Sequence, residues 1–85
     1  SYKDISINGR TVAIGELGLA GECRSVSGID SRVKEAVRLG FDTILIPYHN
    51  YTKLSQPLKN RSGVKIIAVR SIFDSLKLFS GGNKE

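Results

Sequence analysis

Apolar residues in the first part of the chain follow the pattern of β-strands. Residues 11–17 are β-branched or apolar at nearly every position, which predicts a strand, and residues 22–26 alternate loosely, which predicts a second, shorter one. The glycines between these segments indicate a tight turn, so we expect a hairpin around residues 19–21. Residues 1–4 carry neither a strand nor a helix signal, and we assign them no element.

The clearest helix signal in the sequence follows Ser27. This serine precedes Asp30 by three residues, which resembles a capping box with Asp in place of Glu. Gly40 stands where a helix commonly ends with a left-handed residue. Between them, apolar residues recur at helical spacing and form one stripe, made of Ile29, Val33, Ala36 and Val37. The pattern therefore predicts an amphipathic helix that buries this stripe.

Two further strands are indicated in the second half of the chain. Residues 41–46 predict a buried strand that stops at Pro47, and residues 64–69 predict another. The connection between them, residues 48–60, is polar and mixed. It predicts a loop with one or two helical turns broken at Pro57.

A last helix is predicted after Ser71, with Asp74 at the capping-box position and residues 81–82 at its end. We expect its inward face to hold Ile72, Phe73, Leu76 and Phe79. Strands that alternate with helices imply at least one parallel strand pair. The sequence thus predicts an α/β (α+β) fold, with a mixed sheet and two main helices. Its single core is expected to contain Val33, Val37, Ile44, Ile46, Ile66, Ala68, Ile72 and Leu76.

The charge of the chain narrows the classes of partner without selecting one. Thirteen Lys and Arg against eight Asp and Glu give a net charge of +5 over 85 residues. Such a balance favours a polyanion partner, but the basic residues are scattered and form no block of like charge. The single cysteine, Cys23, excludes an internal disulfide and a cysteine-based zinc site, and in a strand it is expected to be a small buried hydrophobe.

Other features of the sequence indicate where in the cell the protein is expected. The chain begins with Ser1 instead of Met, so we expect it to be cut from a longer protein. No signal peptide is recognisable, and the longest apolar run is far shorter than the ~18 residues of a membrane span. An unpaired thiol suits a reducing compartment. We therefore expect a cytoplasmic protein without a membrane partner.

Residues 15–26 read Gly-Glu-Leu-Gly-Leu-Ala-Gly-Glu-Cys-Arg-Ser-Val. They resemble the strand pair of the Lon-type protease domain, whose pattern is G-E-[IL]-x-L-x-G-x-[IV]-x-x-[IV]. The resemblance continues in family order through residues 32–36, 39–41 and 44–47, and it extends over about residues 12–79. It implies a partial Lon-protease-like domain of the ribosomal-protein-S5-domain-2-like type. Residues 1–10 would then be a leading segment, residues 11–80 the C-terminal part of the domain, and residues 81–85 a flexible tail.

The resemblance also bears on catalysis. Lon proteases carry the lysine of a Ser-Lys dyad at the start of the helix, and Asp30 stands at that position here. An aspartate cannot serve as the same base, because the mechanism needs a desolvated lysine that takes the proton of the serine. The resemblance therefore implies no catalytic residue in this chain. In the first turn of a helix, Asp30 is well explained by the helix dipole alone.

Within the superfamily, the hairpin and the helix after it are similar to the RadA (Sms) type of bacterial DNA-repair ATPase. That resemblance implies a non-catalytic, scaffold-like last domain of a DNA-repair and recombination protein. It implies assembly into a homo-oligomeric ring and binding to DNA through the parent protein. No cofactor is implied in this chain, whereas ATP and Mg are implied in the ATPase core of the parent and zinc in its N-terminal ribbon.

Basic residues around the hairpin and first helix are the candidates for DNA contact. Such side chains suit sequence-independent contact with phosphates. For each one alone, an ordinary solvated helix face is an equally good explanation. The main candidates are Arg24, Arg32, Lys34 and Arg38, and weaker ones are Lys53, Lys59 and Arg61.

Neither the histidine nor the glycines indicate another kind of site. A lone histidine without acidic or thiol neighbours rarely binds a metal, so His49 is expected to face solvent. Together with Tyr48 and Tyr51 it could instead offer aromatic faces to a partner or to unstacked bases. The glycines of residues 15–21 lack the spacing of a phosphate-binding loop, and turn geometry explains them better.

Two other functions remain open at this level. One is a fragment of an active ATP-dependent Lon-family serine protease whose serine lies upstream, which Asp30 disfavours. The other is an oligomerisation module without DNA contact.

Overall fold

The computed structural model describes residues 2–82 of the chain, and the side chains of residues 9–77. Its sheet has the order β1 (Tyr2–Asn8), β2 (Thr11–Leu17), β4 (Thr43–Pro47) and β5 (Lys65–Val69). Strand β1 is antiparallel to β2, whereas β2, β4 and β5 run parallel to one another. The short strand β3 (Cys23–Arg24) pairs with the end of β2 and completes the predicted hairpin. The parallel and antiparallel pairs confirm the predicted α/β class with a mixed sheet.

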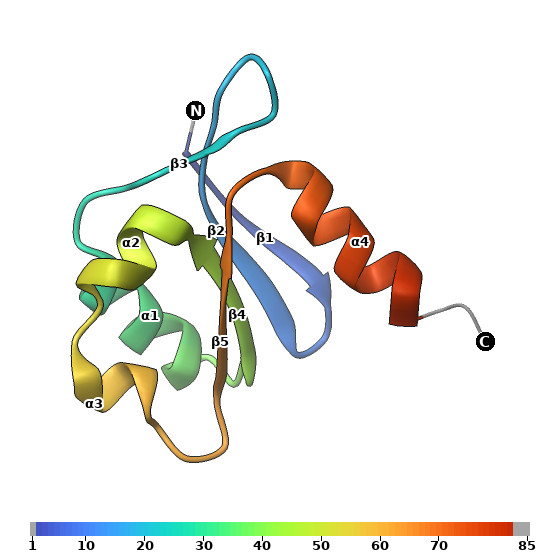
Figure 1. Cartoon of the computed structure of the whole chain (residues 1–85). Helices are drawn as coiled ribbons and strands as arrows, with labels where there is room; N and C mark the ends of the chain where they lie inside the picture. The colour runs from blue at the N-terminus through green and yellow to red at the C-terminus, as the bar shows by residue number, and fades with distance from the viewer. Residues whose placement is uncertain (1, 83–85) are drawn as a thin grey trace.

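Helices lie on both faces of this sheet (Figure 1). Helix α1 (Ile29–Arg38) and the two short helices α2 (Tyr48–Lys53) and α3 (Gln56–Lys59) lie on one face. Helix α4 (Ile72–Gly82) lies on the other. None of the helices in the described part of the chain has the length and apolar character that crossing a membrane requires.

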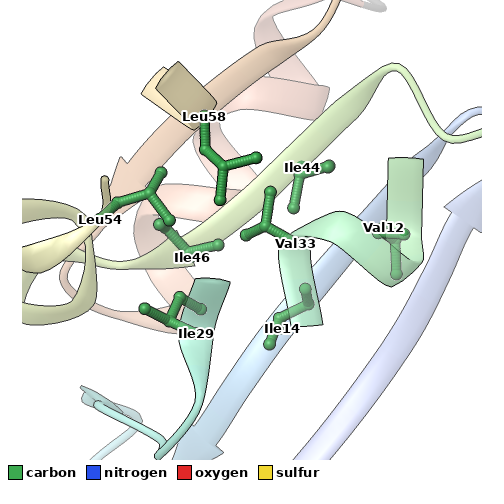
Figure 2. Close-up of a cluster of buried hydrophobic side chains, with 9 residues drawn as sticks. Val12, Ile14, Ile29, Val33, Ile44, Ile46, Leu54 and Leu58 are labelled. Carbon is green, nitrogen blue, oxygen red and sulfur yellow. The ribbon is translucent and has the colours of Figure 1, made fainter. Parts of the chain in front are cut away.

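The core fills the space between α1 and the sheet (Figure 2). Side chains on a strand alternate between its two faces, so every second residue of β2 and β4 points toward α1. The apolar stripe of α1 meets these residues. Leu54, which directly follows α2, and Leu58 of α3 close the layer. The buried cluster consists of Val12, Ile14, Ile29, Val33, Ala36, Ile44, Ile46, Leu54 and Leu58.

Only part of the predicted core belongs to this cluster. Val33, Ile44 and Ile46 are fully buried, and Val37 and Ile66 are half-buried against them. Ala68 is half-buried outside the cluster.

The predicted inward face of the last helix was wrong. Ile72, Phe73 and Leu76 are 37%, 61% and 57% exposed. The apolar spacing is helical as expected, but α4 lies on the sheet face opposite to the core and only partly covers it. The side chain of Phe79 lies outside the described residues.

The first strand was missed. We assigned no element to residues 1–4, but β1 begins at Tyr2 and pairs along its length with β2, from Tyr2 opposite Glu16 to Asn8 opposite Thr11. The two residues between these strands, Gly9 and Arg10, form the turn. The Asn8-Gly9 dipeptide is a turn signal that could have revealed this hairpin.

Helix α1 begins differently from the prediction and ends as predicted. Its N-cap is Gly28, in a left-handed conformation with φ 68°, and no side chain caps the helix, so the predicted capping box does not form. At the other end Gly40 has φ 100°. The Gly40 amide donates to the Val37 carbonyl, and the Phe41 amide donates to the Ala36 carbonyl. These two bonds form a Schellman motif.

The remaining elements agree with the pattern except in detail. Strand β3 is shorter than the predicted residues 22–26. Pro57 lies in the first turn of α3 and does not break a helix, because the missing amide proton of proline costs nothing there. At the start of α4 the Asp74 carboxylate accepts a hydrogen bond from the Arg70 amide (2.8 Å).

Replacing Ile44 with Ala is expected to lower the free energy of unfolding by about 2–5 kcal/mol, since the isoleucine side chain is fully buried in the cluster. Leu19→Ala is the control, because Leu19 is fully exposed and its change is expected to stay within about 0.5 kcal/mol. Urea unfolding followed by circular dichroism measures both. Equal losses in the two variants would contradict the arrangement of the core.

Replacing Gly40 with Ala is expected to cost about 1–2 kcal/mol, because an L-residue is strained in the left-handed conformation. No atom lies within 4 Å of the added Cβ, so steric overlap contributes nothing. Gly9→Ala is the matched control, since its Cβ also meets open space and Gly9 does not have a positive φ. The same unfolding assay applies, and a Gly40 variant as stable as the Gly9 variant would rule out the C-terminal motif as a determinant of stability.

Candidate nucleic-acid interface

Asp30 lies in the first turn of α1, where the resemblance to Lon proteases places the lysine of the dyad. Its Oδ1 accepts a hydrogen bond from the backbone amide of Ser55 at 3.2 Å. Ser55 is the N-cap of α3, so this bond ties the start of α1 to the connection between α2 and α3. The carboxylate therefore has a structural role, although a different one from the predicted capping box.

The basic candidates of α1 do not gather on one side of the helix. Lys34 and Arg38 are one turn apart and both exposed, and the Arg38 guanidinium pairs with the Glu35 carboxylate. Arg32 is only half-exposed and its Nε donates to the Ser27 carbonyl at 2.8 Å. Arg32 precedes Lys34 by two residues, which places the two side chains about 200° apart around the helix axis.

The ion pair between Arg38 and Glu35 shifts the pKa of both side chains. The hydrogen bond from Arg38 holds the pKa of the Glu35 carboxyl below its ordinary value, and the same bond raises the pKa of Arg38. The charge of Arg38 is thus partly neutralised by a neighbour. Lys34 has no ion-pair partner within the part of the chain that the structure describes.

Arg24, the fourth candidate, lies in a different place from the α1 residues. It is the last residue of β3 in the β2–β3 hairpin, and its guanidinium contacts the Glu22 carboxylate at 2.9 Å. The Glu22 carboxylate also accepts a hydrogen bond from the Ala20 amide at 3.1 Å. A backbone hydrogen bond at Glu22 itself, and then the side chain of Arg24, hold the pKa of the Glu22 carboxyl below its ordinary value.

Arg24 lines an open hollow of about 400 Å³, which we call the Arg70–Tyr48 hollow. Two guanidinium groups, an imidazole and a phenol ring line it together with one carboxylate, so the hollow is basic and aromatic in character. Its lining residues are Glu22, Cys23, Arg24, Ser25, Tyr48, His49 and Arg70.

The fold brings this hollow together from three distant parts of the chain. Tyr48 directly follows β4 and Arg70 directly follows β5. Because these strands are parallel neighbours, both residues leave the sheet at its carboxyl edge, where open α/β sheets commonly bind ligands. The third part is β3, whose Cys23 amide donates to the Arg70 carbonyl at 2.9 Å. Backbone hydrogen bonds therefore fix the hollow.

Within the hollow, the side chains of Arg70 and Tyr48 are stacked. The Cζ of Arg70 lies 3.9 Å from the centroid of the Tyr48 ring, a cation–π contact. The His49 ring packs edge-on against Tyr48, with centroids 5.8 Å apart and an interplanar angle of 74°. His49 is exposed, as predicted, and no group of His, Cys, Asp and Glu suited to a metal ion occurs among the described residues.

Arg70 was not among the sequence candidates. Its position directly after a predicted strand was the signal that could have identified it. A residue that follows one parallel strand lies beside the residue that follows the neighbouring strand. Cys23 was expected to be buried, and its side chain is half-buried at the wall of the hollow. This burial raises the pKa of the Cys23 thiol above its ordinary value, and the nearby Asp74 charge adds to the effect.

Arg32 lines a second, separate hollow of about 420 Å³ between α1 and β2. The floor of this second hollow is apolar and is formed by Val12, Ile14, Ala36 and Phe41. Of the four predicted DNA-binding residues, the structure thus places only Arg24 in the hollow with Arg70.

Comparison with known proteins places the chain in a family. The model of the Lon protease (S16) C-terminal proteolytic domain matches residues 2–79. The chain is 39% identical over 82 residues to the DNA repair protein RadA of Bacillus subtilis (strain 168) and 40% identical over 81 residues to that of Halalkalibacterium halodurans. These matches cover 96% and 95% of the chain but only 17% of each relative.

A shorter match is closer in sequence. The DNA repair protein RadA of Mycolicibacterium smegmatis is 51% identical over 47 residues, which are 55% of the chain and 10% of that relative. The prediction from the hairpin and first helix is thus confirmed: the chain belongs to the family of the Lon protease C-terminal proteolytic domain and matches the C-terminal region of bacterial RadA proteins.

Proposed function

We propose that this chain is a Lon-like module without peptidase activity that contacts DNA and supports ring assembly in a cytoplasmic, RadA-type DNA-repair protein. The observation that carries the DNA-binding role is the meeting of Arg24 and Arg70 with two aromatic rings at the carboxyl edge of the sheet. The similarity to proteins named DNA repair protein RadA supports the same role.

The absence of peptidase activity is inferred from the position and the bonding of Asp30. A Ser-Lys mechanism requires an amine that accepts the proton of the serine, and a carboxylate hydrogen-bonded to a backbone amide does not supply that base. The bond from Ser55 also keeps the carboxylate directed at the α2–α3 connection.

Contact with DNA is inferred from the placement of the two guanidinium groups. Arginine forms strong, charge-assisted hydrogen bonds with phosphate oxygens, and such contacts carry no sequence preference. Lys34 and Arg38 form a second exposed basic row on α1, apart from the hollow, and are the second candidates for phosphate contact. Arg32 is the weakest of the four, because it is half-buried and bonded to Ser27.

A pure oligomerisation module is the second candidate, and one observation favours it. Leu19, Phe73 and Leu76 are 106%, 61% and 57% exposed. Gly21 brings the hairpin of Leu19 against α4, because a Cβ on Gly21 would lie 3.3 Å from the Phe73 ring. Exposed apolar residues that gather in this way mark contact surfaces between proteins.

Asp30→Ala is expected to lower the free energy of unfolding by roughly 1–2 kcal/mol, since the Ser55 amide loses a charged acceptor. Neither the wild type nor the variant is expected to hydrolyse a fluorogenic peptide or an unfolded protein. Thermal melting and a peptidase assay with ATP present measure the two effects. Cleavage that disappears when a serine is replaced would refute the proposal and favour the Lon peptidase.

Arg70→Glu is expected to weaken binding of the protein to both single- and double-stranded DNA, and to reduce the slope of log affinity against log salt by roughly 0.7–0.9, because a positive charge beside the phosphate backbone is lost. Lys65→Glu is the matched control. It makes the same charge change at the opposite end of β5, since Lys65 begins this strand and Arg70 directly follows its last residue. The control is expected to keep the wild-type slope.

Light scattering of the same samples separates the two candidate functions. Unchanged affinity and slope in an Arg70→Glu protein that assembles normally would reject the DNA-binding role. Loss of assembly together with loss of DNA binding would favour the oligomerisation module.

A further inference from the structure

We propose that the Arg70–Tyr48 hollow binds one unstacked nucleotide of a single nucleic-acid strand, with the base stacked on the Arg70–Tyr48 pair and the phosphate held by Arg24. This inference rests on the proposed DNA-binding function. It goes further by assigning the site, the form of the strand and the part of the nucleotide that each residue contacts.

The stacking surface is already formed without a ligand. The Cζ of the Arg70 guanidinium lies over the Tyr48 ring, 3.9 Å from its centroid, and the His49 ring packs edge-on against the same ring. Guanidinium planes and aromatic rings are the two kinds of surface on which proteins stack unpaired bases. Any base has a flat π-face, so the site is expected to tolerate all four bases.

The phosphate position follows from Arg24. This side chain is exposed and lines the same hollow, but it is held by the Glu22 carboxylate through two bonds, from Nε at 3.2 Å and from the second guanidinium nitrogen at 2.9 Å. A guanidinium has five donors, so Arg24 keeps donors for a phosphate while Glu22 fixes its orientation. Glu22 also repels the phosphate and thereby weakens binding.

Glu22 itself is placed by the hairpin. The carboxylate lies so close to Gly18 that a Cβ at that position would overlap it, and the Ala20 amide donates to it. The turn of the hairpin therefore fixes the acid that orients Arg24. A side chain at position 18 would displace this carboxylate, and the φ of Gly18 is not left-handed.

The shape of the hollow favours a single strand over a duplex. Its volume of about 400 Å³ lies in the range of small-ligand sites, roughly 300–1,000 Å³. In a duplex the base faces are covered by their neighbours and only phosphates reach such a hollow. A flipped or unpaired nucleotide can insert its base and still leave its phosphate at the rim.

Tyr48→Leu is expected to weaken binding of a short oligothymidine at least about fivefold, because base–aromatic stacking is lost. Binding of a duplex of mixed sequence is expected to change less than about twofold. Tyr48→Phe is the matched control, since it keeps the ring and is expected to bind the oligothymidine like wild type. A Tyr48→Leu variant that binds both forms of DNA like wild type, or loses both equally while remaining folded, would overturn the stacking role.

Glu22→Gln tests the phosphate position through a variant that is expected to strengthen binding. Removing the negative charge while keeping an acceptor for Arg24 is expected to tighten oligothymidine binding about two- to fivefold, the size of an exposed ion-pair effect. Fluorescence anisotropy at several salt concentrations measures this effect. Unchanged or weaker binding would exclude Arg24 as the phosphate contact.

Cys23 provides a test that needs no variant. It is the single cysteine of the chain and lines the hollow. An oligothymidine is expected to slow its alkylation by iodoacetamide several-fold, a matching duplex less, and thymidine monophosphate only at much higher concentration. If all DNA binding is absent, the proposed function fails as well. If DNA binds but leaves the alkylation rate unchanged, only the site proposed for the nucleotide is wrong.

Discussion

Strand β4 is buried on both faces, and the position of nearly every other element follows from this burial. Ile44, Leu45 and Ile46 are exposed by no more than 1%. A strand covered in this way needs a helical layer on one face and a second cover on the other, which is the arrangement of parallel strands in α/β proteins. Helices α1, α2 and α3 supply the first layer and α4 part of the second. The short central strand is therefore the constraint on which the two-sided architecture depends.

The same strand sets the register that builds the candidate site. Pro47 pairs with Val69 at the end of the β4–β5 ladder, so the next residues, Tyr48 and Arg70, leave adjacent strands side by side. A shift of the register by one residue would reverse the faces of β5 and separate the ring from the guanidinium. The stacking contact at 3.9 Å thus follows from the pairing of backbones. The Cys23–Arg70 backbone bond then brings Arg24 to the same place.

Local sequence patterns predicted the elements well and their partners less well. The segments around Val12, Ile44 and Ile66 were identified as strands, because β-branched runs report a local preference. The left-handed Gly40 was found because its chemistry is local too. By contrast, a helical apolar period does not say which side of a sheet the helix will cover. For this reason the buried face of α1 was predicted correctly, whereas Phe73 of α4 was predicted to face inward and is exposed.

The candidate site shows the same division. Arg24 was selected from the sequence, whereas Arg70 depends on parallel pairing between strands that lie about twenty residues apart, which no local pattern encodes. Lys34 and Arg32 were grouped because they are close in sequence, but helix geometry separates residues two apart. Asp30 was identified as a departure from the dyad, yet its partner Ser55 could be found only from the folded chain.

Asp30 is connected to the stacking surface through helix α2 and the segment that follows it. The Asn50 side chain, 5% exposed, donates to the Val26 carbonyl and accepts from the Val26 amide, both at 2.9 Å. The bond between Asp30 and Ser55 holds the connection that follows this helix. These three bonds attach α2 and the connection after it to the segment that begins α1, and Tyr48 is the first residue of α2. A lysine at position 30 has no acceptor for the Ser55 amide, so Asp30 contributes to holding the connection that follows the helix that presents the ring.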